Sequence, residues 1–198
     1  DIAKGEKNTN DLWSYLEWNS QTFSPQDLRM NFITNHDENS WNGTVKERMG
    51  DAAKAFAVLT YTIPGMPLIY SGQEAGNEKA LRFFEKDTIN WNNIIYEDFY
   101  TELNKLKHDN KALWNGLNGG SIVNINTPEE TGVFAFIREK DGNKVVVVIN
   151  LSAKEQVFKT LNESALGSYK NVFSNEIIEV SKETQFDLQA WSYVVLTN

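Results

Sequence analysis

The sequence has 198 residues, of which 40% are hydrophobic and 12% are aromatic, enough to bury one good core or two modest ones. Its net charge of −8 disfavours nucleic acid and anionic lipid as partners, because both are polyanions. The absence of cysteine excludes disulfides and thiolate metal sites. No apolar run reaches the ~18–20 residues of a membrane span, and residues 1–5 lack the basic and apolar segments of a signal peptide.

The first predicted elements are a strand and a helix. Apolar and polar side chains alternate over residues 28–35 with a period of two, which predicts a strand. From about residue 46 the apolar side chains recur with helical spacing. Thr44 with Glu47 three residues later matches a capping box, which predicts that the helix begins there.

A second strand and a second helix follow. Pro64 and Gly65 end the first helix, and the apolar run over residues 66–70 is typical of a short buried strand. Strand, helix and strand in this order predict a βαβ unit and therefore a parallel sheet. Another helix is predicted over residues 98–113, after an irregular excursion over residues 75–97. This half of the chain therefore has an α/β pattern.

The pattern changes at the Asn-Gly-Gly run of residues 118–120. Beyond it, short strands at regular spacing alternate with turn signals, which predicts an antiparallel β-sandwich. The predicted strands cover residues 121–126, 133–139, 144–150, 156–161, 169–173, 176–180 and 191–197. We therefore predict two domains, an α/β domain over residues 1–118 and an all-β domain over residues 119–198.

Polar and ionisable side chains follow directly on the first predicted strand. Asn35, His36 and Asp37 come at its C-terminal end, where active sites collect in parallel α/β folds because the loops converge there. The same residues also fit a simple turn, in which Asn35 and Asp37 cap the following helix. From the residues alone, both interpretations stay open.

Several segments resemble motifs of the alpha-amylase family, glycoside hydrolase family 13. The signature that ends the seventh strand of its catalytic (β/α)8 barrel is similar to residues 32–37, Phe-Ile-Thr-Asn-His-Asp. Its eighth-strand motif is similar to residues 65–74, Gly-Met-Pro-Leu-Ile-Tyr-Ser-Gly-Gln-Glu. Residues 82–91 resemble the segment before the last barrel helix, and residues 135–138 and 147–152 resemble strands of the family's C-terminal domain. The resemblance implies the C-terminal part of a (β/α)8 TIM barrel followed by a β-sandwich domain.

The resemblance also implies roles for individual residues. Asp37 corresponds to the family's transition-state-stabilising carboxylate, and His36 to the imidazole that hydrogen-bonds the sugar at the cleavage site. Retaining glycosidases need a nucleophilic carboxylate and an acid/base carboxyl as well. In this family both lie on the fourth and fifth barrel strands, which precede this sequence. The chain alone is therefore expected to be inactive, and neither Glu38 nor Glu74 is assigned to either role.

Two aromatic residues are candidate contacts for the sugar. Trp41 lies on the same loop as Asp37, where an indole face can stack on a sugar ring or pack beneath the loop. Tyr70, at the end of the eighth strand, either lines the pocket or packs in the barrel. We expect no metal or other cofactor in this chain, although the resemblance allows calcium in a longer protein, near the third barrel strand.

The resemblance implies part of a retaining α-glucan hydrolase that acts on α-1,4 bonds of starch or maltooligosaccharides. There are three alternatives. The first is transglycosylation or isomerisation within the family, and the second is a non-catalytic relative that binds glycan or partner proteins. The third is an autonomous carbohydrate-binding β domain. Two strands cannot close a barrel, so the rest of the barrel or another chain is the expected partner. The residues leave the cellular compartment open, although a secreted or periplasmic bacterial protein would fit.

Overall fold

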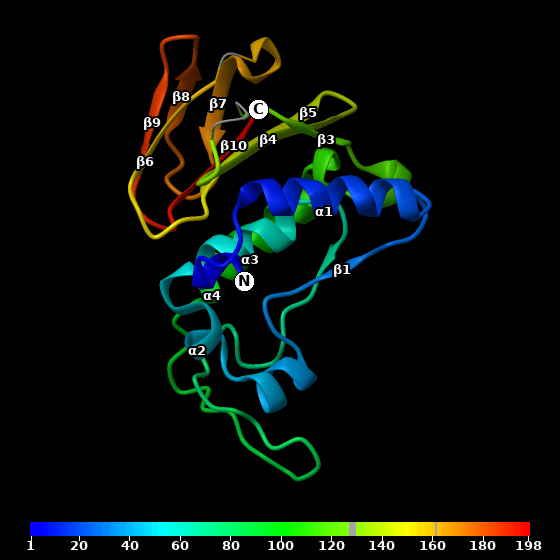
Figure 1. Ribbon diagram of the computed structural model, residues 1–198, viewed down its shortest axis with the longest axis vertical. Coiled ribbons are helices and arrows are strands. Elements are labelled where there is room, and N and C mark those ends of the chain that lie inside the picture. The colour runs from blue at the N-terminus through cyan, green and yellow to red at the C-terminus, as the bar shows by residue number, and fades with distance from the viewer. Residues whose placement is uncertain (127–129, 161) are drawn as a thin grey trace.

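The structure is a computed structural model that describes residues 1–126, 130–160 and 162–198, and it has a helical part and a β part (Figure 1). The helical part contains α1 (Thr9–Thr22), α2 (Val45–Met49), α3 (Ala53–Thr62), α4 (Glu97–Asp109) and the strands β1 (Met30–Asn31) and β2 (Met66–Pro67). Short helical turns are η1 (Ile2–Lys4), η2 (Glu38–Asn42), η3 (Gly50–Ala52), η4 (Lys111–Leu113), η5 (Gly116–Asn118) and η6 (Glu163–Ala165).

The predicted βαβ unit is present, with shorter strands than the sequence pattern suggests. β1 and β2 are parallel, with Met30 opposite Met66 and Asn31 opposite Pro67. Of the strand predicted over residues 28–35, only Met30 and Asn31 pair with a neighbouring strand, because a strand extends only as far as its neighbour offers hydrogen bonds. Pro67 has no N–H group to offer, and β2 is the only strand that pairs with β1 in the described part of the chain.

The predicted first helix is broken into two. Its capping box is confirmed: the Glu47 carboxylate accepts from the Thr44 N–H at 2.8 Å, and the Glu47 N–H donates to the Thr44 hydroxyl. However, Gly50 has φ 52° and ψ −129°, a conformation that only glycine adopts without strain. The chain therefore leaves α2 at Gly50 and restarts as α3, which ends at Thr62 ahead of Pro64.

The sequence pattern did not predict α1. Asn8 caps this helix in a capping box with Asp11, but most of its surface is polar and exposed. The few apolar side chains pack against the β part, where Trp13 lies over Phe134 with their ring centroids 4.3 Å apart. The second predicted helix is confirmed as α4, which ends at Asp109 and is followed by η4.

The β part is an antiparallel sandwich, as predicted. One sheet has six strands in the order β3-β4-β5-β10-β7-β8, and the other pairs β6 with β9. The strands are β3 (Ile122–Asn124), β4 (Val133–Lys140), β5 (Asn143–Asn150), β6 (Gln156–Lys159), β7 (Gly167–Asn171), β8 (Ile177–Val180), β9 (Gln185–Leu188) and β10 (Tyr193–Thr197). All seven predicted strands are found, and β9 was missed. Leu161, at the end of the predicted strand 156–161, lies outside the described residues.

The six-stranded sheet is covered on both faces. One face packs on α1, α3 and α4 (Figure 1), in a core where Phe134, Phe136 and Val147 meet Val58 and Leu103. The other face packs on β6 and β9 in a second core. Strands β4 and β5 read as nearly continuous apolar runs because both of their faces are buried.

Arg138, on β4, joins the two parts. Its side chain is buried, with 2% of the residue exposed, and its guanidinium donates only to backbone carbonyls. Nη1 donates to Thr62 at the end of α3 at 2.9 Å, Nε to Gly120 at 2.9 Å and Nη2 to Trp114 at 3.1 Å. The Thr62 carbonyl lies in the last turn of α3, where carbonyls have no partner within the helix. Burial lowers the pKa of Arg138 to about 10, which leaves it charged at neutral pH.

Lys107, on α4, is a second cation at this junction. Its ammonium donates to the carbonyls of Gly65 at 2.8 Å and Leu113 at 2.5 Å. Burial, and then the nearby charge of Arg138, lower the pKa of Lys107 to about 7. Arg138 and Lys107 therefore donate to five backbone carbonyls where the helical part meets the sheet.

We expect the substitution Arg138→Met to destabilise the chain by at least ~2 kcal/mol, because two buried carbonyls, those of Thr62 and Gly120, lose a charged donor and each costs about 1–3 kcal/mol. The free energy of unfolding would be measured by urea denaturation. Arg82→Met is the matched control, since the Arg82 side chain is exposed and pairs only with the exposed Glu85. Equal losses in the two variants would contradict the role given to Arg138.

Candidate functional site

The residues that follow β1 form a short helical turn with π-helical geometry over Glu38–Asn42, on the side of the helical part that faces away from the sheets (Figure 1). Asn35 caps this turn: its side-chain oxygen accepts from the Glu38 N–H at 2.8 Å, and its carbonyl accepts from the Asn39 N–H at 2.9 Å. Asp37 precedes η2 but makes no side-chain capping bond. Of the two predicted caps, Asn35 is one and Asp37 is not.

Asp37 and His36 instead face solvent together. Their side chains are 59% and 65% exposed, and His36 Nε2 lies 3.5 Å from an Asp37 carboxylate oxygen. A carboxylate and an imidazole that are this close and this exposed can both reach one polar ligand. The turn therefore presents an acceptor and a titratable donor side by side.

The neighbouring carboxylates are placed differently. Glu38 is half-buried and pairs with Arg48 on α2 at 2.8 Å, so it ties η2 to α2. Glu74 has a buried carboxylate oxygen for which no hydrogen-bond partner is found in the described part of the chain. The residue as a whole is half-buried, and its negative charge adds to the burial that raises the pKa of Tyr100 to about 12. Neither Glu38 nor Glu74 shares the exposed face of Asp37.

The excursion over residues 75–97 is attached to the turn. The Asn39 side chain is almost fully buried; its amide group donates to the Lys79 carbonyl at 3.3 Å and accepts from the Leu81 N–H at 2.8 Å. The Ser40 hydroxyl donates to the Leu81 carbonyl at 2.8 Å. Further along, Asp87 pairs with Lys79. These contacts hold the excursion against η2.

The excursion brings two phenylalanines to the site. Phe83 lies between His36 and Trp41, with ring-centroid distances of 5.7 Å and 5.3 Å. Phe84 lies 6.2 Å from Trp41 and 4.8 Å from Phe83. Trp41 is 62% exposed and Phe84 is 85% exposed. We call Trp41, Phe83 and Phe84 the aromatic surface.

The sequence reasoning missed Phe83 and Phe84. The sequence does contain a signal for them, because two adjacent aromatic residues in an otherwise charged segment, Arg-Phe-Phe-Glu-Lys-Asp, are typical of a binding surface. What the sequence could not give was their contact with Trp41, which lies 42 residues earlier. That contact depends on the hydrogen bonds that hold the excursion.

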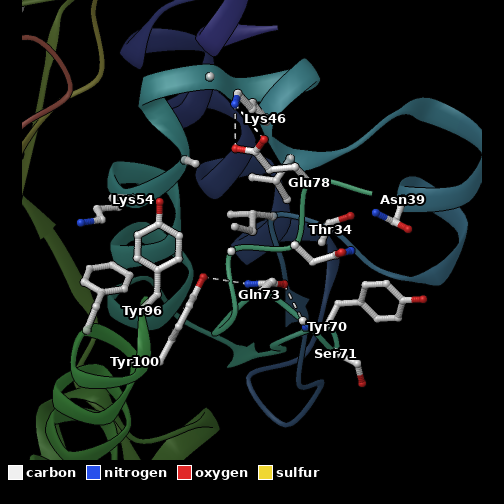
Figure 2. A pocket seen from close by; sticks show the side chains of 18 of the residues that line it. Thr34, Asn39, Lys46, Lys54, Tyr70, Ser71, Gln73, Glu78, Tyr96 and Tyr100 are labelled. Carbon is white, nitrogen blue, oxygen red and sulfur yellow. Dashed lines mark hydrogen bonds and ion pairs between the residues drawn. The ribbon is translucent and has the colours of Figure 1, made fainter. Parts of the chain in front are cut away.

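Tyr70 is separate from this group. It lies after β2 and lines a pocket of about 250 Å³ together with Thr34 and Asn39. Its N–H donates to the Gln73 side chain at 2.8 Å. Figure 2 shows the Tyr70 ring pointing away from the rings of Tyr96 and Tyr100 on the other side of the pocket. The structure thus brings His36, Asp37 and Trp41 together and leaves Tyr70 apart from them, on the wall of a pocket that they do not line.

Within the residues that the structure describes, no group of three His, Cys, Asp or Glu side chains could hold a metal ion. The calcium that the resemblance allows near the third barrel strand of a longer protein stays a prediction. No helix in the same residues is long and apolar enough to cross a membrane.

Comparison with known proteins gives consistent matches for both parts. Residues 4–118 match the family model "Alpha amylase, catalytic domain", and residues 133–195 match "Alpha-amylase SusG C-terminal domain". Alpha-amylase 2 of Dictyoglomus thermophilum is 24% identical over 182 residues, which cover 85% of this chain and 30% of that protein. Cyclomaltodextrinase of Thermoanaerobacter pseudethanolicus is 30% identical over 141 residues, which cover 69% of this chain and 23% of that protein.

Solved structures share the fold. The maltogenic alpha-amylase AmyB of Thermotoga neapolitana superposes with a TM-score of 0.78 at 17% identity, over 100% of this chain and 47% of that one. An alpha-amylase of Lactobacillus plantarum gives a TM-score of 0.77 at 20% identity, over 100% of this chain and 44% of that one. The chain thus spans less than half the length of these proteins.

We expect Asn39→Ala to release the excursion. Loss of its two hydrogen bonds should make the Leu81 amide exchange with solvent about tenfold faster, since one net hydrogen bond is worth roughly 0.5–1.5 kcal/mol. Hydrogen exchange followed by NMR measures this directly. In the control Asn42→Ala, which removes only a bond to the Glu38 carboxylate, the Leu81 rate should stay as it is. A Leu81 rate that is the same in Asn39→Ala and in the unmodified chain would refute the attachment.

Proposed function

The chain belongs to the alpha-amylase family, and on this premise we propose that it is the C-terminal part of a retaining α-glucan hydrolase, in which Asp37 stabilises the transition state. The observation that carries the proposal is the state of Asp37: it is exposed, it caps no helix, and it lies beside His36. A carboxylate used only for structure would be expected to hold backbone N–H groups, as Asn35 does. The proposed bonds are the α-1,4 links of starch or maltooligosaccharides.

In the proposed mechanism Asp37 acts by charge. Glycoside hydrolysis passes through an oxocarbenium-like transition state, in which positive charge develops on the sugar ring. An anionic group held beside that ring stabilises the transition state more than the ground state. His36 would donate a hydrogen bond to a hydroxyl of the same sugar, which fits its exposed place next to Asp37.

The aromatic surface supports a sugar as the ligand. Sugars present C–H faces that pack on aromatic rings, and an indole offers a large apolar face with a polar N–H group. The exposure of Trp41 favours stacking on substrate over packing beneath the loop. Phe83 joins this surface to His36, and Phe84 enlarges it beside Trp41. For Tyr70 we propose contact with substrate from the neighbouring strand end.

The uncovered strands support a partner for the helical part. Leu28, Met30 and Phe32 around β1, and Met66 on β2, are each at least 38% exposed. Exposed apolar side chains on unpaired strands are unfavourable in water. We propose that the remaining barrel strands, or another chain, cover them. The boundary between the domains at residues 118 and 119 stays a prediction.

Transglycosylation remains the alternative reaction. It uses the same double displacement, with a sugar hydroxyl in place of water as the acceptor. Asp37 would have the same role in both reactions, so product analysis has to distinguish them: longer or cyclic glucans indicate transfer, and shorter ones indicate hydrolysis.

We predict that the purified chain alone releases no reducing sugar from soluble starch, because a retaining mechanism has no route without a nucleophile and an acid/base group. Glu38 pairs with Arg48 and Glu74 has a buried carboxylate oxygen, so neither is placed to substitute. A mock purification sets the background. Release above that background, lost in Glu38→Gln or Glu74→Gln, would overturn the prediction.

The role of Asp37 is tested in the complete enzyme, which includes the earlier barrel strands. We expect Asp37→Asn to lower kcat by at least ~10²-fold, the scale of removing one preorganised electrostatic group. KM should change much less, because the interaction strengthens mainly at the transition state. Stability should hold, since Asp37 makes no capping bond to lose.

Asp109→Asn is the matched control, because Asp109 is exposed and contacts only the exposed His108. Both activity and melting temperature should be unchanged in this variant. Near-normal kcat in Asp37→Asn would show that the essential carboxylates lie elsewhere.

A further inference from the structure

A pocket of about 250 Å³ lies beside the turn that carries Asp37 (Figure 2). It is formed by the segments after β1 and β2, by α2 and the start of α3, and by the beginning of α4. Asp37, His36 and Trp41 do not line it. All of its lining residues belong to this chain, so the pocket needs no other part of a barrel to exist.

One wall of the pocket is aromatic. Tyr96, Phe99 and Tyr100 stand at the start of α4 and line it together, and the rings of Phe99 and Tyr100 meet edge to face with centroids 5.1 Å apart. Figure 2 shows Tyr96 and Tyr100 side by side on this wall. Such a wall suits a ligand with C–H faces.

The same wall carries polar groups that can serve a ligand. Gln73 donates to the Tyr100 hydroxyl at 2.9 Å, which leaves the Tyr100 O–H free to donate. Burial raises the pKa of Tyr100 to about 12, so it keeps this proton at neutral pH. The Lys54 ammonium lies 5.0 Å from the Tyr96 ring centroid and 5.6 Å from that of Phe99. No carboxylate pairs with Lys54 within the described residues.

The charges around the pocket balance. At the rim, Lys46 pairs with both oxygens of Glu78, at 2.7 Å and 2.8 Å. Lys54 and Asp51 supply one further charge of each sign. A pocket with no net charge and polar hydrogen-bonding groups favours a neutral polar ligand over an ion.

We propose that this pocket binds a single neutral pyranose ring, such as glucose, at a site separate from Asp37. The volume of about 250 Å³ is just below the ~300 Å³ at which ligand pockets begin, so the pocket has room for about one ring. The choice of a pyranose among neutral polar molecules rests on the proposed function, because glucose is the smallest product of α-glucan hydrolysis. Asn39 lines the pocket and anchors the excursion, so a bound ring lies against the turn that positions Asp37.

The test is a titration of the full 198-residue chain with D-glucose, followed by amide chemical shifts in NMR. We expect saturable binding on the order of millimolar, the strength that a dozen ligand atoms support, with shifts centred on residues 70–78 and 96–100. Tyr96→Leu removes the aromatic face, and Lys54→Gln removes the exposed ammonium with little risk to folding. Each should weaken binding about tenfold or more, and the control Trp18→Leu, an exposed aromatic far from the pocket, should not.

Three results would overturn the proposal: no saturable binding of glucose, binding that Tyr96→Leu and Lys54→Gln leave unchanged, or tighter binding of gluconate than of glucose, which would mark an anion site. Binding that is lost in Trp41→Leu and kept in Tyr96→Leu would place glucose at the Asp37 site instead and would also overturn it. These outcomes are independent of the kcat of Asp37→Asn in the complete enzyme, so failure of the pocket and failure of the proposed function can be told apart.

Discussion

The placement of Arg138 is the constraint on which the rest of the structure depends. A guanidinium in a dry interior is costly unless each donor direction finds an acceptor, and Arg138 meets this need with the carbonyls of Thr62, Trp114 and Gly120. Those carbonyls belong to the end of α3 and to the connection that leads into the sheet. The charge therefore fixes the helical part on β4 at one position, and the apolar core between α3, α4 and the sheet fills in around it.

In the turn η2, the residues that stabilise the local structure are different from the residues that face solvent. The Asn35 side chain accepts a hydrogen bond from the Glu38 N–H, and the Glu38 carboxylate forms an ion pair with Arg48. These contacts stabilise the turn without a side-chain capping bond from Asp37. A side chain that is not needed for the local fold can keep its charge and its exposure. This separation between the residues that build the turn and the residues that it presents is what makes Asp37 a candidate for chemistry.

The excursion over residues 75–97 contributes to both the aromatic surface and the pocket. Its first part is hydrogen-bonded to Asn39 and carries Phe83 and Phe84 to Trp41, which gives the aromatic surface. Its last part leads into α4, whose first aromatic residues form the wall of the pocket. A segment without regular secondary structure thereby shapes two neighbouring surfaces, because side chains of the turn bind three of its backbone polar groups, at Lys79 and Leu81.

The sequence by itself predicted an α/β part followed by an antiparallel β part, the capping box at Thr44 and every strand of the β part except β9, because these follow from local periodicity and turn chemistry. It did not determine α1, whose mostly polar surface hides the contact of Trp13 with Phe134, nor the break at Gly50. It proposed His36 and Asp37 by resemblance and Trp41 by its place on the same loop, yet could not say that Asp37 caps no helix or that Phe83 lies between His36 and Trp41. Only the tertiary structure decided these points, because they depend on contacts between segments far apart in the chain, and no local pattern of residues encodes such a distance.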